Sequence, residues 1–367
     1  MSPSQAAGPA PRHILLACPQ RIGDVLLATP LARSLKHAWP AAAIDLLVFA
    51  GTEGVLAANP DIAQVIAVPP RSGFAANFRL LRRLWRHYDL ALTPLPTDRA
   101  RLYCWAAGRR RLGFLQPRWQ ERSKTLLLNQ WLRFDDRDTH SVSMGLRLAQ
   151  LLDIAPCFEV VPPGLAPRQL EAFQEKLGKL INKTPFCVLH PCPKYRYKMW
   201  PQAAWSGLAA WLAGRGLSVA ITGSAEPVEM AYVNQIVRGQ PGTIVNLAGT
   251  LSLAETAELI RHAQLYVGPD TAVTHIAAAT GTPTIALFGP SNPVKWGPWP
   301  HAWKRFESPW QRSGSARQGN VFLLQGPGDC VPCLHEGCDR HLDSRSDCLD
   351  ALTLEQVKQA AEKMLSG

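Results

Sequence analysis

Residues 267–299 read VGPDTAVTHIAAATGTPTIALFGPSNPVKWGPW and decide the fold more clearly than any other stretch. We expect an apolar strand to end at Gly268, an Ala-rich helix to begin at Asp270 and Thr271, and a second buried strand to cover 282–288. A strand, a helix and a strand in this order predict a parallel βαβ unit. The second strand is followed by FGPSNP (288–293), a loop rich in turn-forming residues.

The same alternation continues along the chain in both directions. Apolar runs too short for helices predict further strands at 13–18, 44–50, 64–68, 89–93, 110–114, 186–190, 217–222, 243–247 and 264–268. Helical patterns fall between them at 24–37, 74–87, 100–107, 203–215, 227–238 and 253–262. The predicted fold class is therefore α/β, with two doubly wound parallel sheets.

The stretch VPPGLAPR (161–168) divides the chain, because three prolines and one glycine in eight residues are typical of a linker. A length of 367 residues also suits two domains. Ligands of such sheets bind beyond the carboxyl ends of the strands, so functional side chains should follow strands. We expect a disordered tail at 1–12, an N-terminal domain at 13–165, a C-terminal domain at 166–350 and a final helix within 351–367.

Composition excludes two classes of protein. Hydrophobic residues make up 47% of the chain and charged residues 18%, which does not suit wholesale disorder. No apolar stretch reaches the roughly 18–20 residues that span a bilayer. The first twelve residues lack the apolar core of a secretory signal, so we expect a cytoplasmic protein.

The positive charge is concentrated in one segment. The net charge is +11, and residues 71–133 alone contain 14 basic and 3 acidic side chains, while the remainder is neutral. Such a field attracts a polyanion, namely nucleic acid, an anionic membrane surface or a phosphorylated acceptor. The alternative is a solvated basic face that binds no partner.

Two motifs follow the first predicted strand of each half. PQRIGD (19–24) contains Gly23, which permits close approach of a ligand, and Asp24, which is either a helix cap or a general base. HPCPKYRYKMWP (190–201) contains Lys194, Arg196 and Lys198, whose charges suit a diphosphate, or else form a basic surface loop.

Residues 267–299 also predict an anion site. The free amides of a helix that starts at Thr271 attract negative charge. His275 lies four residues further on the same face, where it is either a ligand contact or a satisfied core histidine. In TGSAEPVE (222–229), Glu226 either accepts hydrogen bonds from a ribose or is an acidic residue favoured in a first helical turn.

Four of the nine cysteines form a cluster, C-x2-C-x4-C-x9-C, at Cys330, Cys333, Cys338 and Cys348. An odd number of cysteines in a chain without an export signal favours reduced thiols. The irregular spacing leaves open a zinc site, an iron–sulfur cluster or unligated thiols.

Taken together, four segments resemble the family 9 glycosyltransferases, the ADP-heptose:lipopolysaccharide heptosyltransferases. The resemblance covers nearly the whole chain from His13 onward and is strongest to the branch that adds the third heptose of the inner core. Its motifs are RIGDVLLATPLARSLK (21–36), HPCPKYRYKMWP (190–201), LAGTLSLAETAELI (247–260) and DTAVTHIAAATGTPTIALFG (270–289).

The resemblance implies a GT-B fold, in which two Rossmann-like domains face a central cleft. It also implies an inverting transfer of a heptose from an ADP-heptose donor to the lipopolysaccharide inner core, with no metal and no cofactor. The second domain would hold the donor, and the first domain would hold the acceptor. Lipid A anchors that acceptor, so we expect peripheral contact with the inner membrane and no nucleic-acid partner.

The resemblance also assigns roles to residues. Asp24 matches the proposed general base, with Arg21, Gly23, Arg79 and Arg109 as acceptor-binding candidates. The donor-binding candidates are Lys198, Glu226, Asp270, Thr271, Ala272 and His275. The family usually has glycine at position 272, so the methyl group of Ala272 bears on the identity of the donor.

Three other functions compete with this interpretation. The same fold could epimerise or hydrolyse a nucleotide sugar, or transfer a sugar from a different donor. The Arg-rich segment, which includes Trp85, Trp105, Trp119 and Trp131, could stack on nucleic acid. The chain could also be an inactive binding module.

Overall fold

The computed structural model describes residues 9–71, 73–180 and 185–366. Most of the segment predicted to be a disordered tail, residues 1–8 of 1–12, lies outside this range. The chain divides into two compact units. Unit 1 comprises residues 1–161 and 304–307, and unit 2 comprises residues 162–303 and 308–367.

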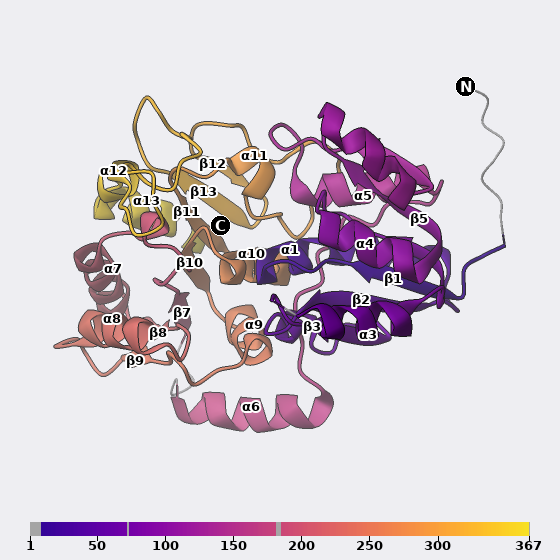
Figure 1. Ribbon diagram of the computed structural model, residues 1–367. Coiled ribbons are helices and arrows are strands. Elements are labelled where there is room, and N and C mark those ends of the chain that lie inside the picture. Colours follow the sequence, from indigo (N-terminus) through magenta and orange to yellow (C-terminus); the bar gives the residue numbers. More distant parts are fainter. Residues whose placement is uncertain (1–8, 72, 181–184, 367) are drawn as a thin grey trace. The chain divides into compact units, whose positions relative to one another are not determined.

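Unit 1 is built on a six-stranded parallel sheet with the order β3-β2-β1-β4-β5-β6 (Figure 1). Its elements are β1 (His13–Ala17), α1 (Ile22–Leu27), α2 (Thr29–Ala38), β2 (Ala43–Phe49), η1 (Glu53–Leu56), β3 (Gln64–Val68), α3 (Phe74–Leu84), β4 (Tyr88–Leu92), α4 (Asp98–Ala107), β5 (Gly108–Leu115), η2 (Trp119–Leu127), β6 (Gln130–Arg133) and α5 (Ser141–Leu151). The core beneath α3 and α4 buries Leu84, Tyr103 and Cys104 against Leu15 and Leu47.

Unit 2 is built on a seven-stranded sheet with the order β12-β13-β11-β10-β7-β8-β9, in which only β12 runs antiparallel to its neighbour. Its elements are α6 (Pro167–Leu180), β7 (Phe186–Leu189), η3 (Arg196–Lys198), α7 (Gln202–Gly214), β8 (Ser218–Ile221), α8 (Pro227–Val237), β9 (Ile244–Asn246), α9 (Leu253–Arg261), β10 (Leu265–Pro269), α10 (Ala272–Thr280), β11 (Thr284–Phe288), α11 (Pro293–Trp296), β12 (Ala316–Gln318), β13 (Val321–Gln325), α12 (Asp347–Asp350) and α13 (Leu354–Leu365).

Helices cover both faces of the second sheet. On one face, α7, α8 and α13 pack Leu208, Ile236 and Val357 against the strands. On the other face, α9 and α10 pack Leu259 and Ala277. The predicted α/β class with doubly wound parallel sheets is therefore confirmed.

One predicted helix is wrong in its extent. The sequence pattern favoured a single helix over 24–37, but the structure has α1 and α2, which are separated at Ala28. Pro30 explains the break, because proline lacks an N–H group and is tolerated only in the first turn of a helix. In the structure it occupies the first turn of α2. The prediction also omitted β6, α5 and β13.

Candidate functional site

In each unit the strand order reverses beside the first strand. In unit 1, β2 and β3 lie on one side of β1 and β4 begins the other side, while in unit 2 the same change occurs between β7 and β10. A crevice forms outside the carboxyl ends of the strands at such a point, and ligands bind there in open α/β sheets. The residues that follow these four strands are therefore the first candidates for function.

Asp24 follows β1 and lies in the first turn of α1. Asp24 and Gly23 are half-buried, and Arg21 is exposed. The alternative that Asp24 caps the helix is wrong, because Arg21 occupies the capping position and its side chain makes no capping hydrogen bond. The carboxylate of Asp24 thus lies at the switch point of the first sheet, together with Arg21 and Gly23.

The other two acceptor-binding candidates do not join this group. Arg109 is the second residue of β5, and it lies close enough to Asp89, near the start of β4, to contribute to the lowered pKa of that carboxyl. The strands are parallel, so Arg109 lies at the edge opposite Asp24. Arg79 is exposed within α3. The structure therefore brings Arg21 and Gly23 together with Asp24, but not Arg79 or Arg109.

An ion pair connects the loops at the switch point of the second sheet. Lys198 Nζ lies 2.5 Å from Asp270 Oδ2, although the two residues are 72 positions apart in sequence. Lys198 ends η3 after β7, and Asp270 follows β10, which is the neighbour of β7. The phenol ring of Tyr197 lies under the ammonium group at 5.8 Å. This places one buried carboxylate and one partly exposed cation at the carboxyl edge of the second sheet.

The surroundings fix the charge of both partners. Burial by itself would raise the pKa of Asp270, but the charge and hydrogen bond of Lys198 and a hydrogen bond from Ser291 lower it. Asp270 therefore remains an anion that holds Lys198 in place. Sequence reasoning missed Ser291, although it lies in the quoted FGPSNP loop after β11 and so could have been expected at this edge.

His275 lies one turn inside α10 and is buried. Burial lowers its pKa to about 4, so the ring is neutral near pH 7. Its Nδ1 atom is buried without a hydrogen-bond partner in the structure. A buried polar atom without a partner costs free energy, so this nitrogen suits a contact with a bound ligand.

Helix α10 starts where the sequence predicted an anion site. Thr271 precedes the helix and makes no side-chain capping hydrogen bond, and both Thr271 and Ala272 are half-buried. The first amide groups of a helix have no partner within it. These amides, the Thr271 hydroxyl and Lys198 are groups that bind phosphate.

Glu226 lies at the capping position of α8, after β8, and its side chain does not cap the helix. The acidic residue in the first turn is Glu229, whose carboxylate accepts a hydrogen bond from the Ser224 amide at 2.9 Å. Glu226 is exposed at the same carboxyl edge as Asp270, with β7 between β8 and β10. Strands are spaced by about 4.8 Å, so roughly 10 Å separates the ends of β8 and β10.

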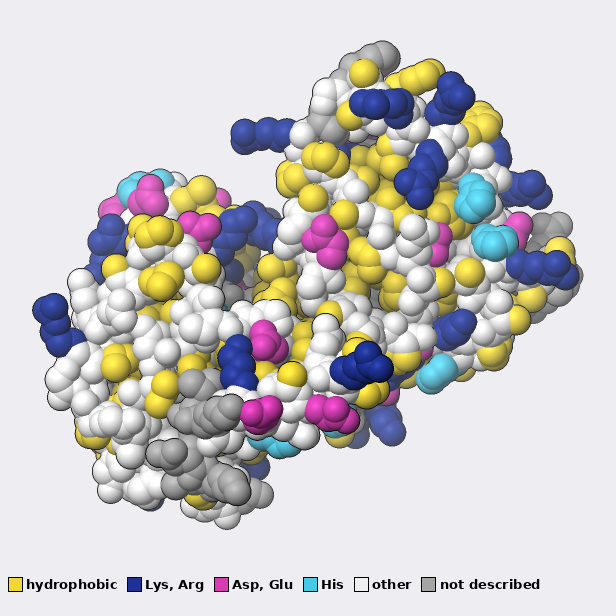
Figure 2. Space-filling view, turned by 90° about the horizontal axis from the view of Figure 1, so that it is seen from below, with side chains coloured by type: hydrophobic (Ala, Val, Ile, Leu, Met, Phe, Trp, Pro, Cys, Tyr) yellow, Lys and Arg dark blue, Asp and Glu magenta, His cyan; other side chains and the backbone are white. Residues whose placement is uncertain are grey.

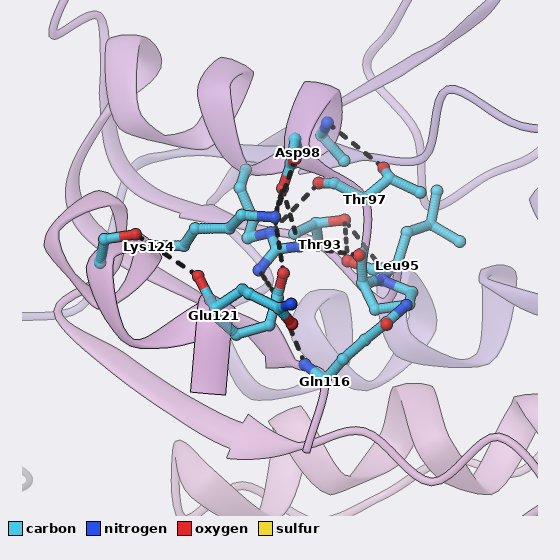
Figure 3. A network of polar contacts seen from close by, with 12 residues as sticks. Thr93, Leu95, Thr97, Asp98, Gln116, Glu121 and Lys124 are labelled. Carbon is cyan, nitrogen blue, oxygen red and sulfur yellow. Dashed lines mark hydrogen bonds and ion pairs between the residues drawn. The ribbon is translucent and has the colours of Figure 1, made fainter. Parts of the chain in front are cut away.

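Figure 3 shows a polar network at the carboxyl ends of β4 and β5, where sequence reasoning predicted nothing. Arg101 of α4 is 1% exposed, and its guanidinium group contacts Glu121 at 2.5 Å and the carbonyl oxygen of Pro96 at 2.8 Å. Lys124 contacts Glu121 at 2.6 Å and Asp98 at 2.8 Å. This network joins α4 and η2 to the loop that follows β4.

All nine cysteines, each within the described residues, are free thiols. Cys348 is buried, and its pKa is raised to about 11 by burial first and by the other three thiols of the cluster as smaller causes. In the described part of the chain, no group of three or more His, Cys, Asp or Glu side chains is arranged to hold a metal ion. Nor is any helix among the described residues long and apolar enough to cross a membrane.

Comparison with known proteins gives consistent matches. The model of glycosyltransferase family 9 (heptosyltransferase) matches residues 77–323. Lipopolysaccharide heptosyltransferase 3 of Escherichia coli K12 is 28% identical over 94% of this chain and 95% of its own length. Lipooligosaccharide heptosyltransferase 2 of Haemophilus influenzae is 30% identical over 77% of this chain and 84% of its own length.

A solved structure shares the fold. The E. coli ADP-heptose lipopolysaccharide heptosyltransferase II superposes with a TM-score of 0.73 at 20% identity, over 96% of this chain and 98% of that one. This likeness confirms the expected GT-B class, in which each unit is a Rossmann-like domain.

Proposed function

This chain belongs to glycosyltransferase family 9 and is a glycosyltransferase, and from that premise we propose that it transfers a heptose from ADP-heptose to the inner core of lipopolysaccharide. The names of the relatives support the donor and the acceptor. The match to heptosyltransferase 3 spans nearly the full length of both chains and supports the branch that adds a third core heptose.

The ion pair of Lys198 and Asp270 beside the start of α10 carries the proposal. It lies at the switch point of the second sheet, where nucleotides bind in such folds. Lys198 and the amides that follow Thr271 would bind the diphosphate of the donor. Asp270 is an anion and does not bind phosphate itself, so we assign it the role of orienting Lys198. Glu226 would accept hydrogen bonds from the ribose.

The chemistry follows from these groups. The acceptor hydroxyl attacks the anomeric carbon, the bond to the diphosphate oxygen breaks, and the carboxylate of Asp24 accepts the hydroxyl proton. Negative charge develops on the departing ADP, and Lys198 and the start of α10 stabilise it. A single displacement inverts the anomeric configuration. Unit 1 contributes the base, and unit 2 contributes the donor site.

Arg21 and Gly23 lie beside Asp24 and would contact the acceptor directly. Arg79 and Arg109 lie elsewhere on unit 1, so they would act through the field of the basic segment. That segment would attract the phosphorylated core at the cytoplasmic face of the inner membrane, where lipid A anchors the acceptor. We therefore propose a cytoplasmic enzyme that associates peripherally with this membrane.

Asp24→Asn tests the chemical step. We expect transfer from ADP-heptose to a truncated core acceptor to be lost, because the amide cannot accept the proton, while the affinity for ADP by calorimetry stays within about twofold. Asp153→Asn is the matched control, since Asp153 is exposed in the same unit. Full activity of Asp24→Asn would refute the assignment of the base. Preference of the wild type for UDP or GDP over ADP would refute the donor.

A further inference from the structure

Segment η2 (Trp119–Leu127) presents two large apolar side chains to solvent. Trp119 is 76% exposed and Leu126 is 80% exposed. Segment η2 follows β5, so it begins at the same edge of the first sheet as the loop that carries Asp24. Trp119, at the start of η2, lies at this edge two strands from β1, whereas Leu126, near the end of η2, lies where the chain returns toward the start of β6.

A buried ion pair holds η2 in place. The guanidinium group of Arg101 is almost fully buried against the carboxylate of Glu121, which lies within η2. Lys124, on the next turn, binds the same carboxylate and Asp98 of α4. Burying two charges is costly, and removing one of them leaves the other uncompensated. The fold therefore fixes η2 in position while it leaves Trp119 and Leu126 in water.

Three exposed basic side chains lie at this edge of the first sheet, and the acidic residues Asp135, Asp136 and Asp138 follow β6 there. Arg118 directly precedes the segment and is exposed, and Arg133 is exposed at the end of β6, which is the neighbour of β5. Arg21 follows β1 at the same edge. Figure 2 shows that dark blue Lys and Arg side chains lie among yellow hydrophobic ones on the surface of the protein. Exposed apolar residues beside basic residues are the composition of segments that lie in the interface of an anionic bilayer.

We propose that η2 is the bilayer-contact element of this protein, and that Trp119 and Leu126 insert among the lipid headgroups while Arg118 and Arg133 bind their phosphates. The inference rests on the proposed function to the extent that a lipid-anchored acceptor must reach the edge that carries Asp24. Trp suits the membrane interface because its ring is amphipathic.

A protein partner fits this surface less well. A stable protein interface buries about 800 Å² on each partner. A tryptophan buries at most about 250 Å². Two side chains on one short segment therefore fall well short of the area that a second copy of the chain would need.

The test compares two double variants of identical composition. Trp119→Ala/Leu126→Ala removes the proposed anchor, and Trp85→Ala/Leu102→Ala removes an exposed Trp and an exposed Leu elsewhere in unit 1. Trp85 directly follows α3 and precedes β4, so it lies at the opposite edge of the sheet. Binding is measured by co-sedimentation with vesicles of phosphatidylcholine, with and without phosphatidylglycerol.

We expect the wild type to bind the anionic vesicles, and the η2 variant to bind at least about tenfold more weakly, or about 1.4 kcal/mol. The control should bind like the wild type. Equal binding by all three proteins, or equal losses in both variants, would overturn the proposal. The proposal would also be overturned if light scattering showed that the wild type is a dimer and that the η2 variant is a monomer.

An acceptor without its lipid separates this proposal from the proposed function. The η2 variant should transfer heptose to this water-soluble acceptor at the wild-type rate, which also shows that it is folded, and should lose activity only on vesicle-embedded acceptor. If the wild type binds vesicles but transfers no heptose to either acceptor, the proposed function fails and the bilayer contact stands. Loss of activity by the η2 variant on the soluble acceptor as well would place η2 in the acceptor site and overturn the proposal.

Discussion

Glu121→Gln should destabilise unit 1 by about 3 kcal/mol at pH 7. Burial alone would raise the pKa of this carboxyl, but hydrogen bonds from Lys124 and Arg101 outweigh it and lower the pKa from 4.5 to about 2. At 1.36 kcal/mol per pH unit, this difference corresponds to about 3 kcal/mol of stability. A similar loss is typical when one partner of a buried ion pair is removed. The amide keeps the shape of Glu121 but leaves the charge of Arg101 less compensated.

The assay is urea unfolding of the wild type and the variant as a function of pH. The carboxyl has a lower pKa in the folded state, so its contribution is fully present above about pH 4.5 and is lost as the pH falls through about 2. The difference between the two proteins should therefore be constant from pH 7 to 5 and should shrink below pH 4.5.

A second carboxylate in unit 1 provides the control. Glu159 pairs with Arg33 at 2.6 Å but is 47% exposed, so Glu159→Gln should cost no more than about 1 kcal/mol. Equal losses for the two variants would refute the argument from burial. A difference between wild type and Glu121→Gln that stays unchanged down to pH 3 would refute the argument from the pKa.

Two further variants test unit 2. Lys198→Ala should weaken ADP binding by at least about tenfold in calorimetry, because a charge-assisted hydrogen bond contributes about 1.5–3 kcal/mol. Arg196→Ala, which removes an exposed cation two residues away, should weaken ADP binding less. Equal effects of the two variants would place the diphosphate elsewhere. Gly326→Ala should destabilise unit 2 by about 2 kcal/mol or more in urea unfolding, because a Cβ atom there would lie 2.0 Å from the carbonyl oxygen of Cys348. Gly178→Ala places a Cβ atom that meets no atom within 4 Å, in the last turn of α6, and should be neutral or stabilising by up to about 1 kcal/mol. A loss like that of Gly326→Ala would refute the steric reason.

The loops of the proposed donor site could be predicted because their positions depend on local pattern. Each follows a short apolar run, and the carboxyl ends of parallel strands lie at one edge of a sheet. The pairing of Lys198 with Asp270 could not be predicted in this way. It requires β7 and β10 to be neighbours, and this strand order depends on how the whole of unit 2 packs.

The buried network of unit 1 could not be predicted for a different reason. Arginine is almost never fully buried, so a sequence with 14 basic residues between 71 and 133 indicates a basic surface. Arg101 is one of those 14 and lies in the interior. Its partner Glu121 is 20 residues away, beyond a strand, and no helical spacing connects them. The break between α1 and α2, by contrast, could have been expected from Pro30.

The distribution of the basic residues shows why net charge alone does not locate a binding surface. Arg109 and Arg118 belong to the same charged segment and flank the same strand, β5, but one lies at its start and the other beyond its end. In a parallel sheet these positions are opposite edges, and only the carboxyl edge carries Asp24. The net charge of +11 between residues 71 and 133 attracts any polyanion to unit 1 as a whole. The direction of the strands then decides which arginines lie at the same edge as Asp24, where they could contact the proposed acceptor.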